Sequence, residues 1–207
     1  LADYPAPDGV DLEVGGTVED QGDAFGDLGT LLILIVILVY IVMATQFESL
    51  KFPFIIMFTI PFAFTGVFLA LWMTSTPLSL IALIGAIMLV GIVTKNGIVM
   101  VDYMNLLIER GSGVFDAVIA GGKSRLRPVL MTSFTTILGM LPLAIGTGAG
   151  SETWQPMGIA VIGGLTFSTI LTLFIVPVLY SILVNRSQRK EREKLARLSA
   201  EHQASKH

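Results

Sequence analysis

The sequence predicts an all-α membrane protein, built as a bundle of five transmembrane helices. Its 207 residues are 53% hydrophobic and only 14% charged, with a mean hydropathy of +0.77, whereas ordinary soluble domains carry about 25% charged residues. The charges gather at the two ends and in one internal stretch, which leaves five long apolar runs. Runs of about 20 residues can cross a bilayer as helices, which satisfy their backbone hydrogen bonds internally.

The N-terminal segment, residues 1–27, is acidic and polar and contains neither lysine nor arginine. Alternating apolar and polar residues at 10–14 predict a short strand, and residues 17–26 are expected to form a short helix that leads into the membrane. The segment is too short to bury a core of its own. Because the chain begins with Leu1 rather than Met, we expect it to be part of a longer protein.

The apolar runs predict five spans in order along the chain. They lie at about residues 28–47, 53–73, 78–104, 129–146 and 157–184. Pro61 and Pro177 lie within the second and fifth runs, and each is expected to kink its helix. An amphipathic stretch at residues 114–119 predicts a short interfacial helix before the fourth span. Residues 185–207 mix Glu, Lys and Arg, which predicts a solvated helix or a disordered tail.

The basic residues predict the orientation in the membrane. Of the 13 Lys and Arg residues, all except Lys95 fall after the first span, after the third span or in the C-terminal tail. With five spans, these three segments share one side of the membrane, and the other side has no basic residue. The positive-inside rule therefore places the N-terminus outside and the C-terminus in the cytoplasm.

Lys95 is a charged residue within the third apolar run. A charge near the middle of a bilayer costs at least about 2.5–3.5 kcal/mol, so such a residue is either buried against a partner or part of a mechanism. The simpler alternative is that the side chain extends to the membrane interface. Lys95 lies on the order of 12 Å from the inner end of its run, and extension would cover only part of that distance. We therefore expect it to face the interior of the bundle.

The counter-charge of Lys95 is expected on a segment outside this chain. Asp102 lies two helical turns further on, on the same face but roughly 10 Å nearer the cytoplasm. That separation is too long for a direct ion pair, although a water molecule could extend the contact. No acidic residue lies at depth in the other four runs.

Enzyme classes that depend on histidine or cysteine are excluded. The only histidines, His202 and His207, lie in the tail, and the chain has no cysteine, so nucleophile–histidine systems lack a base. The His-Glu-x-x-His pattern of metalloproteases is absent, and the glycine-rich residues 146–151 are not followed by Gly-Lys-Ser/Thr as in a phosphate loop. We expect no enzymatic activity, no cofactor, no metal site and no nucleic-acid binding.

Two hydroxyl residues, Thr132 and Ser133, lie just inside the fourth run, after Arg125 and Arg127. Such hydroxyls either pack helices together or relay protons, and spacing alone leaves both interpretations open. Small residues in the third and fifth runs predict close helix packing. These are Gly85, Ala86, Gly91, Gly97, Gly158, Ala160, Gly163 and Gly164.

Several stretches resemble the resistance–nodulation–cell division (RND) superfamily of efflux pumps. Residues 91–102, GIVTKNGIVMVD, resemble the tenth transmembrane helix of these pumps, and residues 125–133, RLRPVLMTS, resemble the start of the eleventh. Residues 146–151 resemble the loop that follows, and residues 46–49 the inner end of the eighth helix. The match continues in order from about residue 15 to 185. The chain thus resembles the C-terminal part of an AcrB-like hydrophobe/amphiphile multidrug pump.

The resemblance implies half of an RND transmembrane domain, helices eight to twelve, with residues 1–27 as the end of the periplasmic porter domain. It also implies a proton relay. Lys95 matches the lysine that pairs with two aspartates on the fourth helix, Thr132 the relay threonine, and Arg125 the arginine of the cytoplasmic proton path. Asn96 matches the neighbour of the lysine, and Asp102 a position where many relatives carry an acid. Protonation of the aspartates would release Lys95 and drive drug/proton antiport, with protons as the coupling ion.

The resemblance further implies the partners and the location. These are a Gram-negative inner membrane and its lipid bilayer, a homotrimer, a periplasmic adaptor, an outer-membrane channel, and an N-terminal part of the pump with the intramembrane Asp pair. Lysine at position 95 argues against the heavy-metal branch, whose pattern has a glutamate in that region. The alternatives are a five-helix accessory module that does not transport, and an RND relative that exports lipid or another cargo.

Overall fold

The computed structural model describes residues 17–146, 148 and 150–204, and all of the regular structure among these residues is helical. The helices are α1 (Thr17–Phe47), α2 (Lys51–Met57), α3 (Thr59–Met73), α4 (Leu80–Glu109), α5 (Val114–Ile145) and α6 (Ser151–Ala204). Together α2 and α3 form one candidate membrane span, and each of the other helices forms another. The predicted all-α protein with five spans is confirmed, while the strand predicted at residues 10–14 lies outside the described residues.

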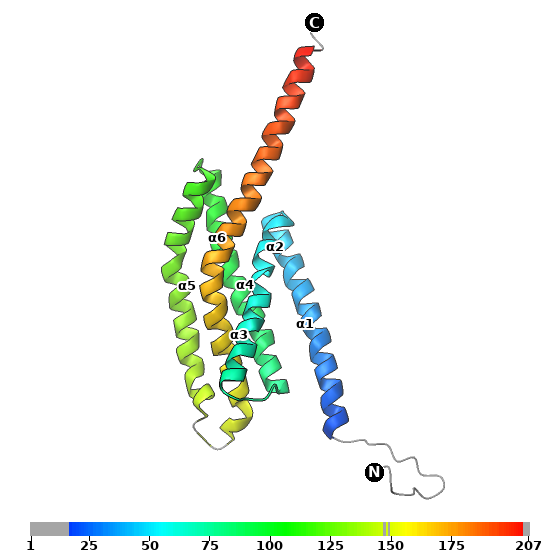
Figure 1. The fold of residues 1–207 in the computed structure, drawn as a ribbon, viewed down its shortest axis with the longest axis vertical. Helices are drawn as coiled ribbons and strands as arrows, with labels where there is room; N and C mark the ends of the chain where they lie inside the picture. The colour runs from blue at the N-terminus through cyan, green and yellow to red at the C-terminus, as the bar shows by residue number, and fades with distance from the viewer. Residues whose placement is uncertain (1–16, 147, 149, 205–207) are drawn as a thin grey trace, which may run out of the picture.

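The helices stand side by side, and successive connections alternate between the two ends of the bundle (Figure 1). The turns from α1 to α2 and from α4 to α5 lie at one end, where the C-terminal half of α6 projects beyond the bundle. The connections from α3 to α4 and from α5 to α6 lie at the opposite end. Among the described residues, the Lys and Arg residues other than Lys95 therefore belong to the end from which α6 projects, which we call the basic end.

The second predicted span is two helices, because α2 ends at Met57 and α3 begins at Thr59. Proline lacks an N–H group, and its ring clashes with the carbonyl group four residues earlier. For Pro61 that carbonyl belongs to Met57, so the helix breaks there and not at the proline itself. The kink predicted at Pro177 does not end its helix, since α6 continues through that residue.

The fourth predicted span and the interfacial helix before it are one continuous helix, α5, which has Pro128 inside it. Contact with α4 explains why the helix does not stop between them. A Cβ atom placed on Gly121 would lie 2.6 Å from the side chain of Met104, so this part of α5 packs closely on α4. Likewise, the helix predicted to lead into the membrane is the first part of α1, which begins at Thr17. The predicted C-terminal tail is helical as far as Ala204, as part of α6.

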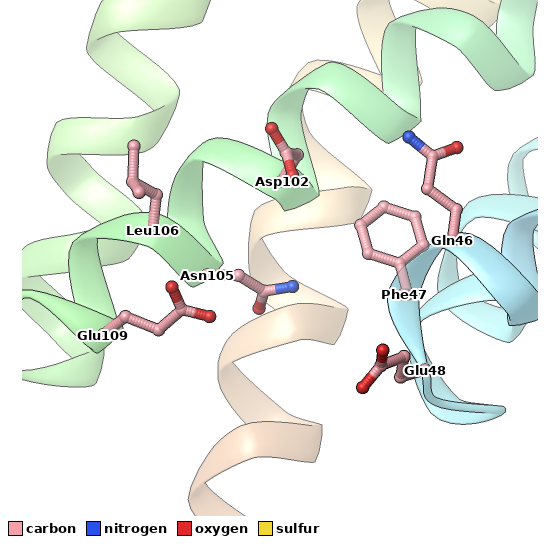
Figure 2. Close-up of a pocket in the computed structure, with 7 residues that line it drawn as sticks. All are labelled: Gln46, Phe47, Glu48, Asp102, Asn105, Leu106 and Glu109. Atoms are coloured by element: carbon pink, nitrogen blue, oxygen red, sulfur yellow. The ribbon is translucent and has the colours of Figure 1, made fainter.

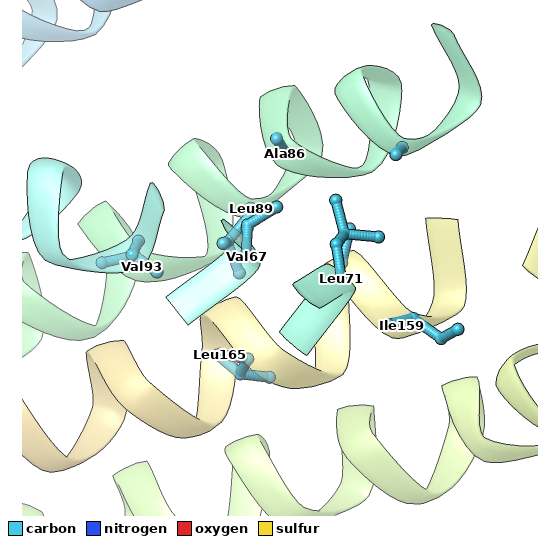
Figure 3. Packing of buried hydrophobic residues seen from close by; sticks show 10 residues of the cluster. Val67, Leu71, Ala86, Leu89, Val93, Ile159 and Leu165 are labelled. Atoms are coloured by element: carbon cyan, nitrogen blue, oxygen red, sulfur yellow. The ribbon is translucent and has the colours of Figure 1, made fainter. Parts of the chain in front are cut away.

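Helix α6 is central and packs against α3, α4 and α5. Figure 3 shows the apolar core where α3, α4 and α6 meet, which includes Val67, Leu71, Ala86, Leu89, Val93, Ile159 and Leu165. Small residues allow α3 and α6 to approach closely, because a Cβ atom on Gly66 would lie 2.8 Å from the carbonyl oxygen of Gly163. Gly91, one of the predicted packing glycines, differs from the others named here, since a Cβ placed on it would meet no described atom within 4 Å beyond the adjacent turns of its own helix.

Helix α1 lies at the edge of the bundle and diverges from it toward the N-terminus (Figure 1). Only 6% of the residues in an apolar 18-residue stretch of α1 are buried, compared with 56% for the corresponding stretch of α4. Its exposed side chains include Ile33, Leu34 and Leu38. Such a surface is suited to hydrocarbon and not to water.

Candidate functional site

One face of α4 is left uncovered along the whole length of the helix. Its exposed residues are Ile84, Met88, Gly91, Lys95, Asp102, Leu106 and Glu109. Their spacing of three, four or seven residues places them on one side of a helix. On the other sides α4 contributes much of the buried core, including Val90, Val93 and Met100. Helix α4 therefore has one face that no described segment covers.

Lys95 lies near the middle of this open face. It is about 20 Å from either end of α4 at a rise of about 1.5 Å per residue. Among the described side chains, none forms an ion pair or hydrogen bond with its ammonium group. Within these five helices Lys95 does not face the interior, because Val93, Thr94 and Gly97 occupy the buried positions beside it; burial of Lys95 against a segment outside this chain stays a prediction.

The neighbours of Lys95 in sequence are differently placed. Thr94 is buried, and its hydroxyl donates to the carbonyl oxygen of Val90 at 2.8 Å. Asn96 is half-buried at the edge of the open face. Asp102 is exposed on the same face as Lys95, two turns away, so the two groups share a face but do not form an ion pair.

Arg125 lies against Tyr103 of α4. Its guanidinium carbon is 4.6 Å from the centre of the Tyr103 ring, a cation–π contact that connects α5 to α4. Its Nε atom is buried and has no hydrogen-bond partner among the described residues. An unpaired buried donor costs about 1–3 kcal/mol, so an acceptor is expected beside Arg125 in the assembled protein.

The structure separates Thr132 from Ser133. Ser133 is buried, and its hydroxyl is hydrogen bonded to that of Thr169 on α6 at 2.9 Å, so it packs two helices together. Thr132 is exposed, and its hydroxyl donates to the carbonyl oxygens of Val129 at 3.0 Å and Pro128 at 3.2 Å in its own helix. It lies two turns from Arg125 on the same face of α5. Neither residue is hydrogen bonded to Lys95 within the described part of the chain.

Asp102 faces a hollow at the basic end of the bundle, shown in Figure 2. The hollow has a volume of about 280 Å³ and lies between the end of α1 and the last turns of α4. Its lining residues are Gln46, Phe47, Glu48, Asp102, Asn105, Leu106 and Glu109. The hollow is therefore lined by three carboxylates, of which one is the predicted relay residue Asp102. Among the described residues, no group of three acidic, histidine or cysteine side chains is arranged to hold a metal ion.

A buried tyrosine supports the wall of this hollow. Tyr180 of α6 is fully buried, and its hydroxyl donates a hydrogen bond to Oδ1 of Asn105. The Tyr180 ring stacks on Phe52 with ring centres 5.6 Å apart. Sequence reasoning did not identify Asn105, Glu109 or Tyr180. Asn105 and Glu109 follow Asp102 by three and seven residues, and this spacing indicates that they share its face of the helix.

Comparison with known proteins identifies a family that matches most of the chain. A profile of the AcrB/AcrD/AcrF family matches residues 3–184. The swarming motility protein SwrC of Bacillus subtilis and the cobalt-zinc-cadmium resistance protein CzcA of Cupriavidus metallidurans are each 38% identical over 185 residues, 89% of this chain. The multidrug resistance protein MdtC of Erwinia tasmaniensis is 42% identical over 163 residues, 78% of this chain.

A solved structure agrees with these sequence matches. The crystal structure of a heavy metal efflux pump has a TM-score of 0.75 and 30% identity over 86% of this chain, which corresponds to 18% of that pump. The chain likewise spans 18% of SwrC, 17% of CzcA and 16% of MdtC. It therefore corresponds to less than one fifth of each relative.

Proposed function

The chain belongs to the AcrB/AcrD/AcrF family of RND efflux transporters, and we propose that it forms the C-terminal part of a pump driven by proton antiport. The observation that carries this proposal is Lys95, a charge without a described partner at the middle of an uncovered helix face. Such a charge is too costly to leave facing hydrocarbon. In this proposal a further segment of the pump covers α4 and supplies carboxylates to Lys95.

Protonation of these carboxylates supplies the coupling step. While they are ionised, they attract the Lys95 ammonium group and stabilise one arrangement of α4 against the covering segment. Once they are protonated, that attraction is lost and a second arrangement becomes populated. Alternation between the two arrangements drives the export cycle.

The path of the proton follows α4 and α5 toward the basic end. Arg125 and Thr132 share one face of α5, and Asp102 opens into the acidic hollow. Water molecules bridge the roughly 10 Å between Asp102 and Lys95. The unpaired Nε of Arg125 supports this arrangement, because a water or a carboxylate beside it would satisfy the donor.

The proposed cargo is a drug or another amphiphile. The support is the resemblance of residues 91–102 to the hydrophobe/amphiphile branch and the match to a multidrug resistance protein. Export of a divalent metal is the second candidate, favoured by the similarity to CzcA and to a heavy metal efflux pump.

The proposal extends to the assembly. The pump would be a homotrimer in the inner membrane of a Gram-negative bacterium, joined to a periplasmic adaptor and an outer-membrane channel. The N-terminus of this chain would lie in the periplasm and its C-terminus in the cytoplasm.

The substitution Lys95→Ala in the full-length protein tests the coupling. In a host that lacks its own pumps, we expect resistance to amphiphilic dyes and detergents to fall to the level of cells without the gene. Arg110→Ala is the matched control, since Arg110 is an exposed basic residue at the end of α4, and it should keep full resistance. Unchanged resistance in Lys95→Ala at equal expression would refute the relay. Resistance to zinc or cobalt but not to amphiphiles, lost in Lys95→Ala, would instead establish the metal cargo.

A further inference from the structure

Helix α5 carries residues of interest on two of its faces. Arg125, which is half-buried, and Thr132, which is exposed, lie on the first face, toward Tyr103 and α4. The second carries Arg127 and Phe134, which lie seven residues apart and are both exposed. At a helical repeat of 3.6 residues, Ser133 lies between the two faces, where it is buried against α6. Buried Ser133 therefore separates the two faces on one flank of α5, while exposed Met131 and Leu138 join them on the other.

This second face borders a groove between α5 and α6. The groove has a volume of about 130 Å³ and is lined by Leu130, Ser133, Phe134, Ile137, Thr166, Thr169 and Ile170. Its hydroxyl groups already have partners, because Ser133 is bonded to Thr169 and the Thr166 hydroxyl donates to the carbonyl oxygen of Ile162 at 2.7 Å. The groove therefore offers only apolar contacts to an occupant. Pockets for drug-sized ligands measure about 300–1,000 Å³, so this groove is suited to a narrow apolar chain.

Two cations lie at the basic end of the groove. Lys123 and Arg127 are one helical turn apart and both exposed, and neither is paired with a described side chain. Arg127 is one turn from Leu130 and about 10 Å from Phe134 along the helix. The nearest acid on the same side of α5 is Asp116, about 10 Å beyond Lys123, so it leaves the positive charge of the pair uncompensated.

We propose that this groove binds an anionic phospholipid, with one acyl chain against Phe134 and Ile170 and the phosphate at Lys123 and Arg127. Basic residues at the membrane interface attract anionic head groups. The apolar groove begins one helical turn from Arg127 toward the membrane interior, where the acyl chain of a bound lipid would follow its head group. A covering helix from a second copy of the chain would fill the groove without needing the two cations. The site does not depend on proton coupling or on the cargo.

Native mass spectrometry of the full-length protein in mild detergent tests this site. The added probes are phosphatidylglycerol, which is anionic, and phosphatidylethanolamine, which is zwitterionic. We expect Lys123→Gln and Arg127→Gln each to weaken phosphatidylglycerol binding by about fivefold, the factor typical of one basic residue at a membrane surface. Arg110→Gln is the matched control, because Arg110 is exposed at the same end but lies outside the groove, and it should leave binding unchanged.

Two further variants separate charge, groove and folding. Arg127→Lys keeps the charge and should retain binding, which would show that Arg127→Gln acts through charge. Thr166→Phe fills the groove but leaves both cations, and it should also weaken phosphatidylglycerol binding. Equal losses in Arg110→Gln and Arg127→Gln would overturn the proposal, as would full binding in Thr166→Phe. Disulfide crosslinking between two copies through Phe134→Cys would overturn it as well, because the face would then be covered by protein.

Discussion

Thr132 and Ser133 are adjacent hydroxyl residues, but their surroundings differ and so do their expected roles. Ser133 is buried and bonded across to Thr169, whereas Thr132 is exposed and bonded only to carbonyl groups of its own helix. A hydroxyl of the second kind can exchange its partner for water or for a group on another segment. The proposed relay therefore uses Thr132, and Ser133 has a packing role.

Thr132→Val in the full-length protein should abolish proton-coupled export and leave stability nearly unchanged, because valine keeps the shape of threonine but has no hydroxyl. Thr132→Ser keeps the hydroxyl and should retain transport. Ser133→Ala should do the opposite of Thr132→Val, keeping transport and lowering stability by about 0.6 kcal/mol, an average for interhelical hydrogen bonds in membranes. Proton-driven dye transport in vesicles and thermal unfolding in detergent measure the two effects. Full transport by Thr132→Val would contradict the relay role.

Tyr180→Phe should lower the free energy of unfolding by about 0.5–1.5 kcal/mol, the usual net contribution of one hydrogen bond. The variant removes the bond to Asn105 but keeps the ring that stacks on Phe52. Tyr40→Phe is the control, since the Tyr40 hydroxyl makes only an exposed contact of 3.3 Å to the carbonyl oxygen of Leu50. Equal losses measured by thermal unfolding in the two variants would contradict a special role for the buried bond.

At the scale of the element, close contact between helices depends on where glycine occurs. Gly66 and Gly163 let α3 and α6 approach so closely that a Cβ atom on either would clash with the other helix, and a Cβ atom on Gly164 would clash with Leu89 of α4. Gly91 is equally small but lies on the open face of α4. Composition alone therefore identifies glycine-rich helices but does not identify which glycines are in contact.

Gly163→Ala should destabilise the bundle by about 1–3 kcal/mol, the usual cost of overfilling a packed core. The added methyl group would collide with Ala70 and lie 2.9 Å from the carbonyl oxygen of Gly66. Gly122→Ala is the matched control, because a Cβ placed there would meet no described atom within 4 Å beyond the adjacent turns of its own helix. It should be neutral or slightly stabilising, since alanine favours helix more than glycine does. A comparison of thermal unfolding of the two variants tests this, and equal stability would contradict the packing argument.

At the scale of the whole molecule, the five spans form an open arrangement. One side of α4 is uncovered through the depth of the bundle, and the connections divide its ends into a basic end and an end without basic residues. The first property leaves a surface for a further segment. The position of the basic residues predicts that the basic end faces the cytoplasm.

Single cysteines should report this orientation, because the chain has none of its own. Thr74→Cys, in the connection from α3 to α4, should react in intact cells with a maleimide that does not cross the inner membrane. Ser112→Cys, in the connection from α4 to α5, should react only after that membrane is permeabilised. The reverse pattern would contradict the orientation predicted from the basic residues.

The sequence by itself determined the five spans and the residues proposed for the relay. Hydrophobic length is a property of a local stretch, and a membrane imposes the same length on every span, so the apolar runs were sufficient to predict the fold class. A lysine within such a run is costly wherever the helices lie. Lys95 could therefore be identified without any knowledge of its neighbours, and Asp102, Arg125 and Thr132 were identified through resemblance.

Only the tertiary structure decided which side of each helix is covered. It placed Lys95 on the open face of α4, set Arg125 against Tyr103, and separated Thr132 from Ser133. It also joined Tyr180 to Asn105 beside the acidic hollow and formed the groove between α5 and α6. These contacts join residues far apart in the chain, because exposure of a helix face depends on the helices packed against it and not on the composition of the helix itself.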